Sequence, residues 1–193
     1  LSFARDYNQK SLKELMAPCS ACFLVLTKTQ RYVAQHDDLA RRVHAGLQAI
    51  DLEYHGAVQV RHPLDVFVNY MGVRRIAKAV KRRLNGLKVA CYYGCQVVRP
   101  FATFDSAHDP TSMDRLVEAL GAKPIRWPLK TRCCGGALTG TIPDVGLRLS
   151  EILLRDAAQR GAEVMVTVCP LCQFNLECYQ REIGRTFRDS TPL

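Results

Sequence analysis

The sequence has no run of about 18 consecutive apolar residues, so it predicts no transmembrane helix. No basic–apolar–small signal segment stands at the start of the chain. The first residue is Leu rather than Met, and we expect the chain to be processed or to be a piece of a longer protein. With 48% hydrophobic and 23% charged residues, the composition is that of a soluble globular protein.

Motifs for nucleotides and nucleic acids are also missing. The chain contains neither a Gly-rich dinucleotide fingerprint nor a P-loop, so binding of NAD, flavin or ATP is not expected. The net charge of +9 attracts anionic partners. However, no nucleic-acid motif is present, and aromatic residues do not interleave with the basic ones. Nucleic acid is therefore not an expected partner.

Cysteine, in contrast, is abundant, with nine residues. In a secreted protein this number would indicate disulfides. Here several cysteines are adjacent or stand in C-x-x-C pairs, which form strained bridges when vicinal but share a metal or a cluster well. The spacing favours ligation over a disulfide framework, and it predicts a reducing, cytoplasmic compartment.

Five of these cysteines form a spaced group in the second half of the chain. Between Cys95 and the adjacent pair Cys133-Cys134 lie 37 residues, and 34 more separate that pair from Cys169-Pro170-Leu171-Cys172. Five thiols exceed the four that a zinc ion or an ordinary cubane iron–sulfur cluster takes. A zinc site that uses four of the five is the alternative, but it leaves the fifth thiol and the adjacent pair unexplained.

This pattern, with Cys-Cys-Gly at 133–135 and Cys-Pro-Leu-Cys-Gln-Phe-Asn at 169–175, resembles the CCG-domain (cysteine-rich domain) proteins typified by the B subunit of heterodisulfide reductase. The resemblance implies an iron–sulfur oxidoreductase subunit that acts on thiol and disulfide groups. In such proteins each five-cysteine set holds a noncubane 4Fe–4S cluster. Carried over by motif, the cluster ligands and the catalytic centre here are Cys95, Cys133, Cys134, Cys169 and Cys172.

The resemblance also implies partners. The usual ones are a ferredoxin-like iron–sulfur C subunit, which supplies electrons, and a flavoprotein A subunit. The substrate is expected to be a disulfide or its thiols. A quinone-linked or sulfur-oxidation reaction stays open, because the same module is used in such systems. The competing hypothesis, from another class, is a zinc-stabilised and non-catalytic assembly module.

The second half of the chain alternates expected strands and helices. We expect strands at Lys88–Tyr93, Pro124–Trp127 and Glu163–Val168, and helices at Ser112–Leu120, from Pro143 to about Arg160, and from Pro170 to about Ile183. This order favours a parallel sheet with helices on its faces, and ligands gather at the carboxyl ends of such strands. Thr111 and Asp114 have the spacing of a capping box for the first helix.

The first half contains a partial repeat. Cys19-Ser20-Ala21-Cys22 matches the motif at Cys169–Cys172, and Ser2–Leu15 takes the place of Leu149–Val166. We therefore expect an α/β fold of two similar lobes, each a small parallel sheet flanked by helices, with the first repeat truncated. No cysteine precedes Cys19, so we expect Cys19 and Cys22 to be an incomplete second cluster site, a dithiol, or a site that residues outside this sequence complete. The pair is expected to face the first site across a cleft.

The expected domains are 1–60, the remainder of the first lobe with its connector, 61–87, a basic helical connector, and 88–193, the complete second lobe. The connector has the densest charge: in Val73–Leu84 six Lys and Arg residues surround an apolar face, which predicts a surface helix. We expect its basic face to be exposed to solvent, to dock to an acidic partner, or to associate peripherally with an anionic membrane. His62, in a string that also resembles the family, is the histidine of most interest. Cys91 is expected in the core, and Cys178 is expected to be structural.

Overall fold

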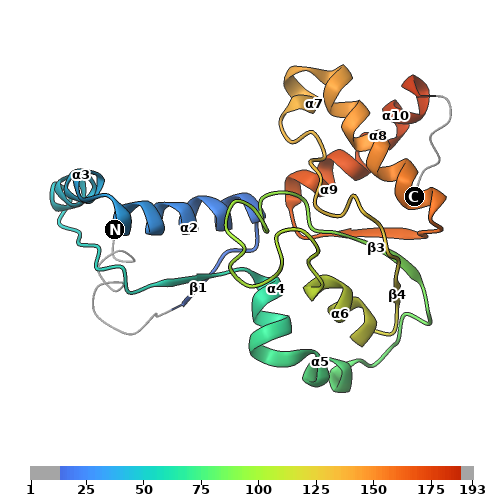
Figure 1. Ribbon diagram of the computed structural model, residues 1–193, viewed down its shortest axis with the longest axis horizontal. Helices are drawn as coiled ribbons and strands as arrows, with labels where there is room; N and C mark the ends of the chain where they lie inside the picture. Colours follow the sequence, from blue (N-terminus) through green and yellow to red (C-terminus); the bar gives the residue numbers. More distant parts are fainter. Residues whose placement is uncertain (1–13, 188–193) are drawn as a thin grey trace.

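The computed structural model describes residues 14–187. Figure 1 shows an arm that extends from a larger body; it consists of β1 (Glu14–Met16), α2 (Ser20–Gln35), α3 (Asp37–Gln48) and β2 (Gln59–Arg61). The two strands of the arm pair in parallel, with Leu15 opposite Val60. The pairing of β1 with β2 therefore places the segment before Cys19 beside the segment before His62.

The larger body holds the remaining elements of the described chain. In order these are α4 (Pro63–Asp65), the π-helix η1 (Val66–Gly72), α5 (Val73–Ala79), β3 (Lys88–Tyr92), α6 (Ser112–Ala119), β4 (Lys123–Pro124), α7 (Leu138–Thr141), α8 (Pro143–Gln159), β5 (Val164–Thr167), α9 (Pro170–Glu177) and α10 (Gln180–Thr186). Their strands form a parallel sheet in the order β4-β3-β5. The mixed α/β fold with small parallel sheets flanked by helices is therefore confirmed.

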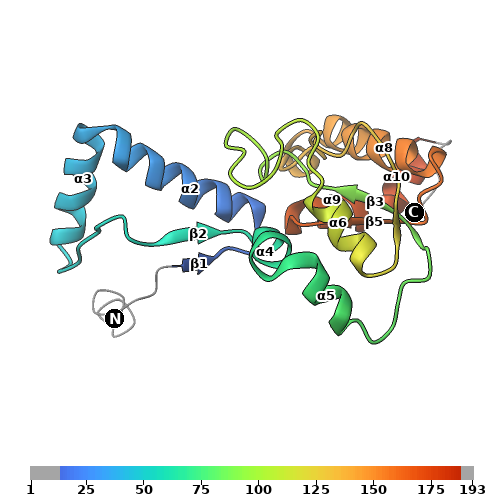
Figure 2. The same ribbon diagram turned by 60° about the horizontal axis from the view of Figure 1, so that its bottom comes forward.

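The central strand β3 is buried on both faces of this sheet. Its side chains alternate, so Ala90 and Tyr92 pack into a core with residues of α8, α9 and α10, whereas Val89, Cys91 and Tyr93 pack with α4, η1 and α6. Figure 2 shows the helices on the two sides of β3 and β5. Cys91 is 0% exposed, which confirms its expected place in the core.

The strand expected at Pro124–Trp127 is shorter, and it begins earlier than predicted. Only Lys123 and Pro124 pair with β3, after which the Ile125 amide still donates to the Val89 carbonyl at 2.9 Å. At the next position of the ladder, the Trp127 indole N–H donates to the Cys91 carbonyl at 3.2 Å. The side chain replaces the backbone donor, because the large ring is buried in the core at this point.

The basic helix is also shorter than the predicted Val73–Leu84. It ends at Ala79, and Val80 has extended backbone angles. The Leu84 and Gly86 amides donate to the carbonyls of Leu120 and Gly121 at the end of α6, at 3.1 and 2.8 Å. These bonds to another helix replace the bonds that a continued helix would have made within itself, so only part of the 61–87 connector is helical.

Two further helix predictions need correction. The side chain of Thr111 does not cap α6; instead the Asp105 carboxylate accepts the Thr111 and Ser112 amides, at 3.0 and 2.7 Å. The expected helix from Pro170 to Ile183 is interrupted at Cys178–Tyr179, which separates α9 from α10. The interruption redirects the chain so that Ile183 is buried in the same core as β3.

The expected internal repeat is not shown by the described residues. Both C-x-x-C motifs do begin with a cysteine of extended conformation at the N-cap of a helix, Cys19 before α2 and Cys169 before α9. However, α2 has 16 residues and α9 has 8, and the sheets differ in their strand number. Most of Ser2–Leu15, the predicted counterpart of Leu149–Val166, lies outside the described residues. The division at 60 and 87 stays a prediction, and β2 crosses the first of these boundaries.

Within residues 14–187, none of the helices combines the length and the apolar character that crossing a bilayer requires.

Candidate functional site

The segment that carries Cys95 is tied to the segment that precedes Cys133. Three consecutive carbonyls, of residues 130 to 132, accept hydrogen bonds from the end of β3 and the turn after it. The donors are the backbone amides of Tyr93 (2.9 Å) and Gly94 (3.1 Å), the Tyr92 hydroxyl (2.7 Å) and the Arg99 guanidinium. This backbone pairing brings two cysteine groups that are far apart in sequence to the same edge of the sheet.

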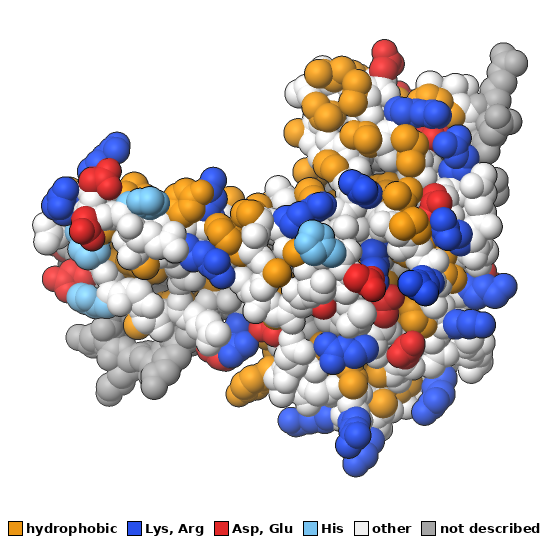
Figure 3. Space-filling model, viewed as in Figure 1, with side chains coloured by type: hydrophobic (Ala, Val, Ile, Leu, Met, Phe, Trp, Pro, Cys, Tyr) orange, Lys and Arg blue, Asp and Glu red, His pale blue; other side chains and the backbone are white. Residues whose placement is uncertain are grey.

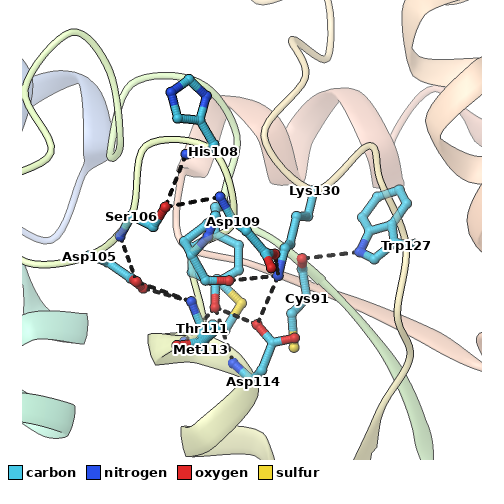
Figure 4. A network of polar contacts seen from close by, with 12 residues as sticks. Cys91, Asp105, Ser106, His108, Asp109, Thr111, Met113, Asp114, Trp127 and Lys130 are labelled. Atoms are coloured by element: carbon cyan, nitrogen blue, oxygen red, sulfur yellow. Dashed lines mark hydrogen bonds and ion pairs between the residues drawn. The ribbon is translucent and has the colours of Figure 1, made fainter.

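A polar network around Lys130 holds the loop that follows the Cys95 segment (Figure 4). The Lys130 ammonium group lies 2.7 Å from the Asp109 carboxylate and 2.6 Å from the Pro110 carbonyl. The Tyr93 hydroxyl accepts the Met113 amide at 2.8 Å at the start of α6. Asp109 is exposed, and its pKa is lowered by the hydrogen bond and the charge of Lys130. The network fixes the loop between Cys95 and α6.

The Cys133-Cys134 turn requires glycine where it meets α8. Gly135 has φ +103°, and a Cβ there would lie 2.9 Å from the carbonyl oxygen of Gly146 in α8. The Ser150 hydroxyl, one turn further along α8, donates to the Cys134 carbonyl at 2.8 Å. The turn therefore packs closely against α8. Cys134 is 2% exposed, whereas Cys133 is exposed.

The C-x-x-C motif lies at the start of α9. Cys169 is the N-cap residue, and Cys172 is in the first turn, so backbone N–H groups at the helix start face the thiols. The Sγ atoms of Cys172 and Cys134 are 3.5 Å apart. A Cβ on Gly94, whose φ is +70°, would lie 3.3 Å from the Cys172 Sγ. The three cysteine groups therefore converge on one place at the carboxyl ends of β3 and β5, as predicted.

Asn175 joins the two cysteine motifs, and the sequence analysis gave it no role. It is 0% exposed, and its Nδ2 donates to the Gly136 carbonyl at 2.9 Å and to the Cys134 Sγ at 3.5 Å. Its Oδ1 accepts the Thr139 hydroxyl at 2.9 Å. Asn175 lies three residues after Cys172 in α9, so helical spacing is the signal that places both on one face.

The buried thiols are hydrogen-bonded to one another, and this changes their pKa values. Hydrogen bonds from the Cys172 thiol lower the pKa of Cys134 and of Cys169, and the same bonds raise the pKa of Cys172. Backbone amides of Gly136 and of the α9 start lower the first two pKa values further. Burial raises the pKa of Cys95, and the charge and hydrogen bond of Cys133 raise it more. Thiolates stabilised in this way are soft ligands for a cation or a cluster.

The structure thus brings the five sequence-predicted residues together in two layers. Cys134, Cys169 and Cys172 form a buried floor, 2%, 5% and 7% exposed, and Cys95 and Cys133 form a more accessible rim. Among residues 14–187, no three His, Cys, Asp or Glu side chains are grouped so that they could hold a single metal ion. The exposed Cys178, at the end of α9, has no hydrogen bond to this group in the described structure.

Cys19 and Cys22 lie beside the Cys169 end of the site. The Ser20 hydroxyl, between them in sequence, donates to the Val168 carbonyl at 3.0 Å. A hydrogen bond with Cys19 raises the pKa of the exposed Cys22, and the charge of Cys169 adds a smaller increase. The arm therefore presents its C-x-x-C motif next to the second one.

His62 lies in the same region and is almost entirely buried. Its ring packs edge-on against Phe23 of α2, with centroids 5.5 Å apart, and stacks on Phe104. Its Nδ1 accepts the Leu64 amide at 3.2 Å, which caps α4. Burial lowers the pKa of His62 to about 4, so the ring is neutral at pH 7. The other His residues of the described chain, at 36, 44, 55 and 108, are exposed.

Comparison with known proteins agrees with the cysteine pattern. Residues 89–177 match the CCG family, described as a cysteine-rich domain. This range contains all five cysteines of the site and most of the strand β3.

Whole-chain relatives extend this similarity to the arm. The chain is 32% identical over 171 residues to the 8-methylmenaquinol:fumarate reductase membrane anchor subunit of Wolinella succinogenes, an alignment that covers 87% of this chain and 58% of that protein. It is 24% identical over 184 residues to the B subunit of the ferredoxin:CoB-CoM heterodisulfide reductase of Methanosarcina mazei, covering 93% and 61%. A protein of Archaeoglobus profundus that is described as similar to the heterodisulfide reductase B subunit is 27% identical over 178 residues, covering 89% and 60%. The chain therefore spans about three fifths of the length of these relatives.

Proposed function

We propose that this chain, which contains a CCG cysteine-rich domain and is distantly homologous to the B subunit of heterodisulfide reductase and to a fumarate reductase anchor subunit, is an iron–sulfur redox subunit of a multisubunit reductase complex. The relatives are subunits of such complexes. The proposal rests above all on one observation, the convergence of three cysteine groups at one edge of the sheet, with Cys134 and Cys172 in sulfur contact.

The residues of the site fit a cluster better than a single ion. Cys95, Cys133, Cys134, Cys169 and Cys172 would hold a noncubane 4Fe–4S cluster, because five thiols exceed the four that a single zinc ion takes. Gly94 and Gly135 keep Cβ atoms out of the space beside the thiols. When bound, such a cluster supplies one-electron redox chemistry. The chain itself supplies thiolates, the Asn175 amide hydrogen bond to sulfur, and a floor that excludes water.

Two classes of electron acceptor are consistent with the relatives. One relative is named for the CoB-CoM heterodisulfide and another for a methylmenaquinol. We propose disulfide reduction or formation as the reaction, with transfer to a quinone as the second candidate. The rim formed by the exposed Cys133 and the half-buried Cys95 gives a substrate access to the thiol groups. Cys19 and Cys22 are the candidate ligands of a second, incomplete site, since the arm places them beside Cys169.

The partners are proposed to be a ferredoxin-like iron–sulfur C subunit and a flavoprotein A subunit. Leu171 and Phe174, which flank Cys172 on α9, are 42% and 51% exposed and form an apolar surface beside the site. Figure 3 shows Lys and Arg side chains gathered at the lower end of the larger body, where α5 lies in Figure 1. We propose this basic end as the place of peripheral membrane association or of an acidic partner.

Metal analysis tests the proposal. Protein purified without oxygen is expected to be brown, with broad visible absorption and about four irons and four sulfides per chain. Stoichiometric zinc without iron would instead favour the non-catalytic assembly module. Electron paramagnetic resonance of the reduced and oxidised protein then distinguishes a redox-active cluster from iron bound without function.

A further inference from the structure

The positive charge of this chain is concentrated in one segment of the larger body. Residues 66–88, which form η1, α5 and the segment that leads into β3, contain seven Lys and Arg residues and no Asp or Glu. They therefore supply most of the net charge of +9. All seven basic side chains are exposed, and none forms an ion pair with another residue of the described chain. Their field is consequently available to an anionic partner.

Apolar side chains lie among these charges. An open hollow of about 540 Å³ is lined by three apolar and three basic side chains, which are Val68, Met71, Val73, Arg74, Arg75 and Lys78. Met71 is 39% exposed. Its neighbour Tyr70 is 70% exposed, the largest value among the large hydrophobic side chains that the structure describes. A basic face that only meets water needs no exposed apolar side chains, so the combination indicates a surface that a partner covers.

The apolar side chains decide which anionic partner fits this surface best. An acidic protein surface would place carboxylates against Tyr70 and Met71 and remove water from them, at a cost in free energy. The surface of an anionic bilayer offers phosphate groups to the cations and, a few ångströms deeper, hydrocarbon to the apolar groups. Tyr is also enriched at the interface between lipid and water, because its ring is apolar and its hydroxyl is polar.

We propose that residues 66–88 dock on the surface of an anionic lipid bilayer. Tyr70 and Met71 insert at the level of the headgroups, and the basic side chains of α5 contact the lipid phosphates. In Figures 1 and 2, α5 lies at the opposite end of the larger body from α8, so a docked chain presents α8 away from the bilayer. The inference rests on the proposed function and deepens it, because it chooses the membrane over the acidic partner for the reductase subunit.

Flotation with lipid vesicles tests this inference on the anaerobically purified chain. We expect binding to phosphatidylcholine vesicles in which about a third of the lipid is anionic phosphatidylglycerol. Vesicles of phosphatidylcholine alone should bind at least about 10-fold more weakly, because they do not attract the cations. Raising the salt to about 0.5 M NaCl should weaken binding to the anionic vesicles by a similar factor, since salt screens exposed charges.

Two matched pairs of arginines locate the charged contact. Arg74→Gln/Arg75→Gln should weaken binding to the anionic vesicles by about 25-fold, because each cation near such a surface contributes about 5-fold. Arg41→Gln/Arg42→Gln is the control. Arg41 and Arg42 are also an adjacent, exposed pair on a helix, α3 of the arm, and their removal changes the net charge equally. The control should lose much less binding.

Two matched methionines test the apolar contact at constant charge. Met71→Gln should weaken vesicle binding by about 4-fold, because the exposed part of its surface is no longer transferred into an apolar environment. Met16→Gln is the control, since Met16 is 56% exposed on β1 of the arm. It should bind the vesicles as the unmodified chain does.

The possible results separate this inference from the proposed function. Absence of binding to the anionic vesicles, or equal losses within either matched set of variants, would overturn it. Binding of polyaspartate that depends on Arg74 and Arg75, without binding of vesicles, would assign the surface to an acidic partner and also overturn it. Iron content is measured on the same preparation. Iron-loaded protein that does not bind vesicles overturns the inference alone, whereas iron-free protein that binds them keeps the surface and removes the proposed redox function.

Discussion

The hydroxyl of Ser20 donates a 3.0 Å hydrogen bond to the carbonyl oxygen of Val168, across 148 residues of sequence. Ser20 stands between Cys19 and Cys22, and Val168 immediately precedes Cys169. Ser20 is 1% exposed. This partly buried bond fixes the arm to the larger body at the point where the two C-x-x-C motifs approach each other.

Ser20→Ala should loosen this junction. We expect a loss of about 1 kcal/mol in the free energy of unfolding, because the partly buried Val168 carbonyl loses its hydroxyl donor. Hydrogen exchange followed by mass spectrometry should show faster exchange in α2 than in β3. Ser112→Ala is the control, since the Ser112 Oγ is buried without a partner and its removal should cost almost nothing. Equal losses of unfolding free energy in the two variants would contradict a stabilising role for the Ser20–Val168 hydrogen bond.

Substitutions of the proposed ligands should not be equivalent to substitution of Cys178. Cys133→Ser and Cys134→Ser are expected to lose iron together with the folding free energy that metal binding contributes. Cys178→Ser should keep its iron, because Cys178 lies at the exposed end of α9. Iron and sulfide analysis of anaerobic preparations measures this. Equal iron loss in all three variants would mean that the ligand assignment is wrong.

Asn175→Leu should destabilise the turn that carries Cys134. The substitution keeps the approximate volume but removes the acceptor Oδ1 of the Thr139 hydroxyl and the Nδ2 donor to the Gly136 carbonyl. These two groups then keep only their 3.2 Å hydrogen bond to each other, so the loss should be about 1–2 kcal/mol. Urea unfolding of the purified chain gives the difference. Gln173→Leu, on the same helix, is the control, because Gln173 is exposed and its side chain bonds only to Glu177 in the described structure. Its effect is expected to be within about 0.5 kcal/mol.

Gly94→Ala should reduce iron binding in addition to straining the backbone. At φ +70° a non-glycine residue costs about 1–2 kcal/mol, and the new Cβ would lie 3.3 Å from the Cys172 Sγ. Gly56→Ala separates the two effects, since Gly56 has φ +69° and nothing lies within 4 Å of the added carbon. Both variants should lose similar stability without metal, and only Gly94→Ala should bind less iron. Full iron content in Gly94→Ala would show that metal binding does not need the space between Gly94 and the Cys172 Sγ.

Burial of neutral His62 should make stability fall with acid. Its pKa is about 4 in the folded chain and 6.5 in the unfolded one, so the unfolded state takes up the proton first as the pH falls below 6.5. The loss should reach about 2 kcal/mol at pH 5. His62→Asn is the comparison, because Asn also accepts a capping amide but does not titrate. Unfolding by urea at pH 7, 6 and 5 should show a shallower decline in the variant, and parallel declines would contradict the assignment.

The convergence of the cysteine groups could be predicted because residue type and spacing are local properties of a sequence. Cys133-Cys134 and the motif at Cys169–Cys172 specify soft donors, and alternating strand and helix segments place them after strands of a parallel sheet. The burial of Cys91 followed from the apolar character of its strand. Element boundaries were less certain, because bonds to distant residues decided them: Leu84 donates to Leu120 rather than continuing its helix, and Trp127 takes the place of a strand residue.

By itself, then, the sequence determined the type of fold, the positions of the cysteines proposed as ligands and the spacing between them. Only the tertiary structure decided which thiols form the buried floor, that Asn175 bonds to Cys134, and that Asp105 caps α6. It also decided that the arm closes on Val168 and encloses His62 beside Cys169. The physical reason is the same in each case: a hydrogen bond or a buried contact between residues far apart in the chain depends on how the helices pack, and no local pattern of residues encodes that packing.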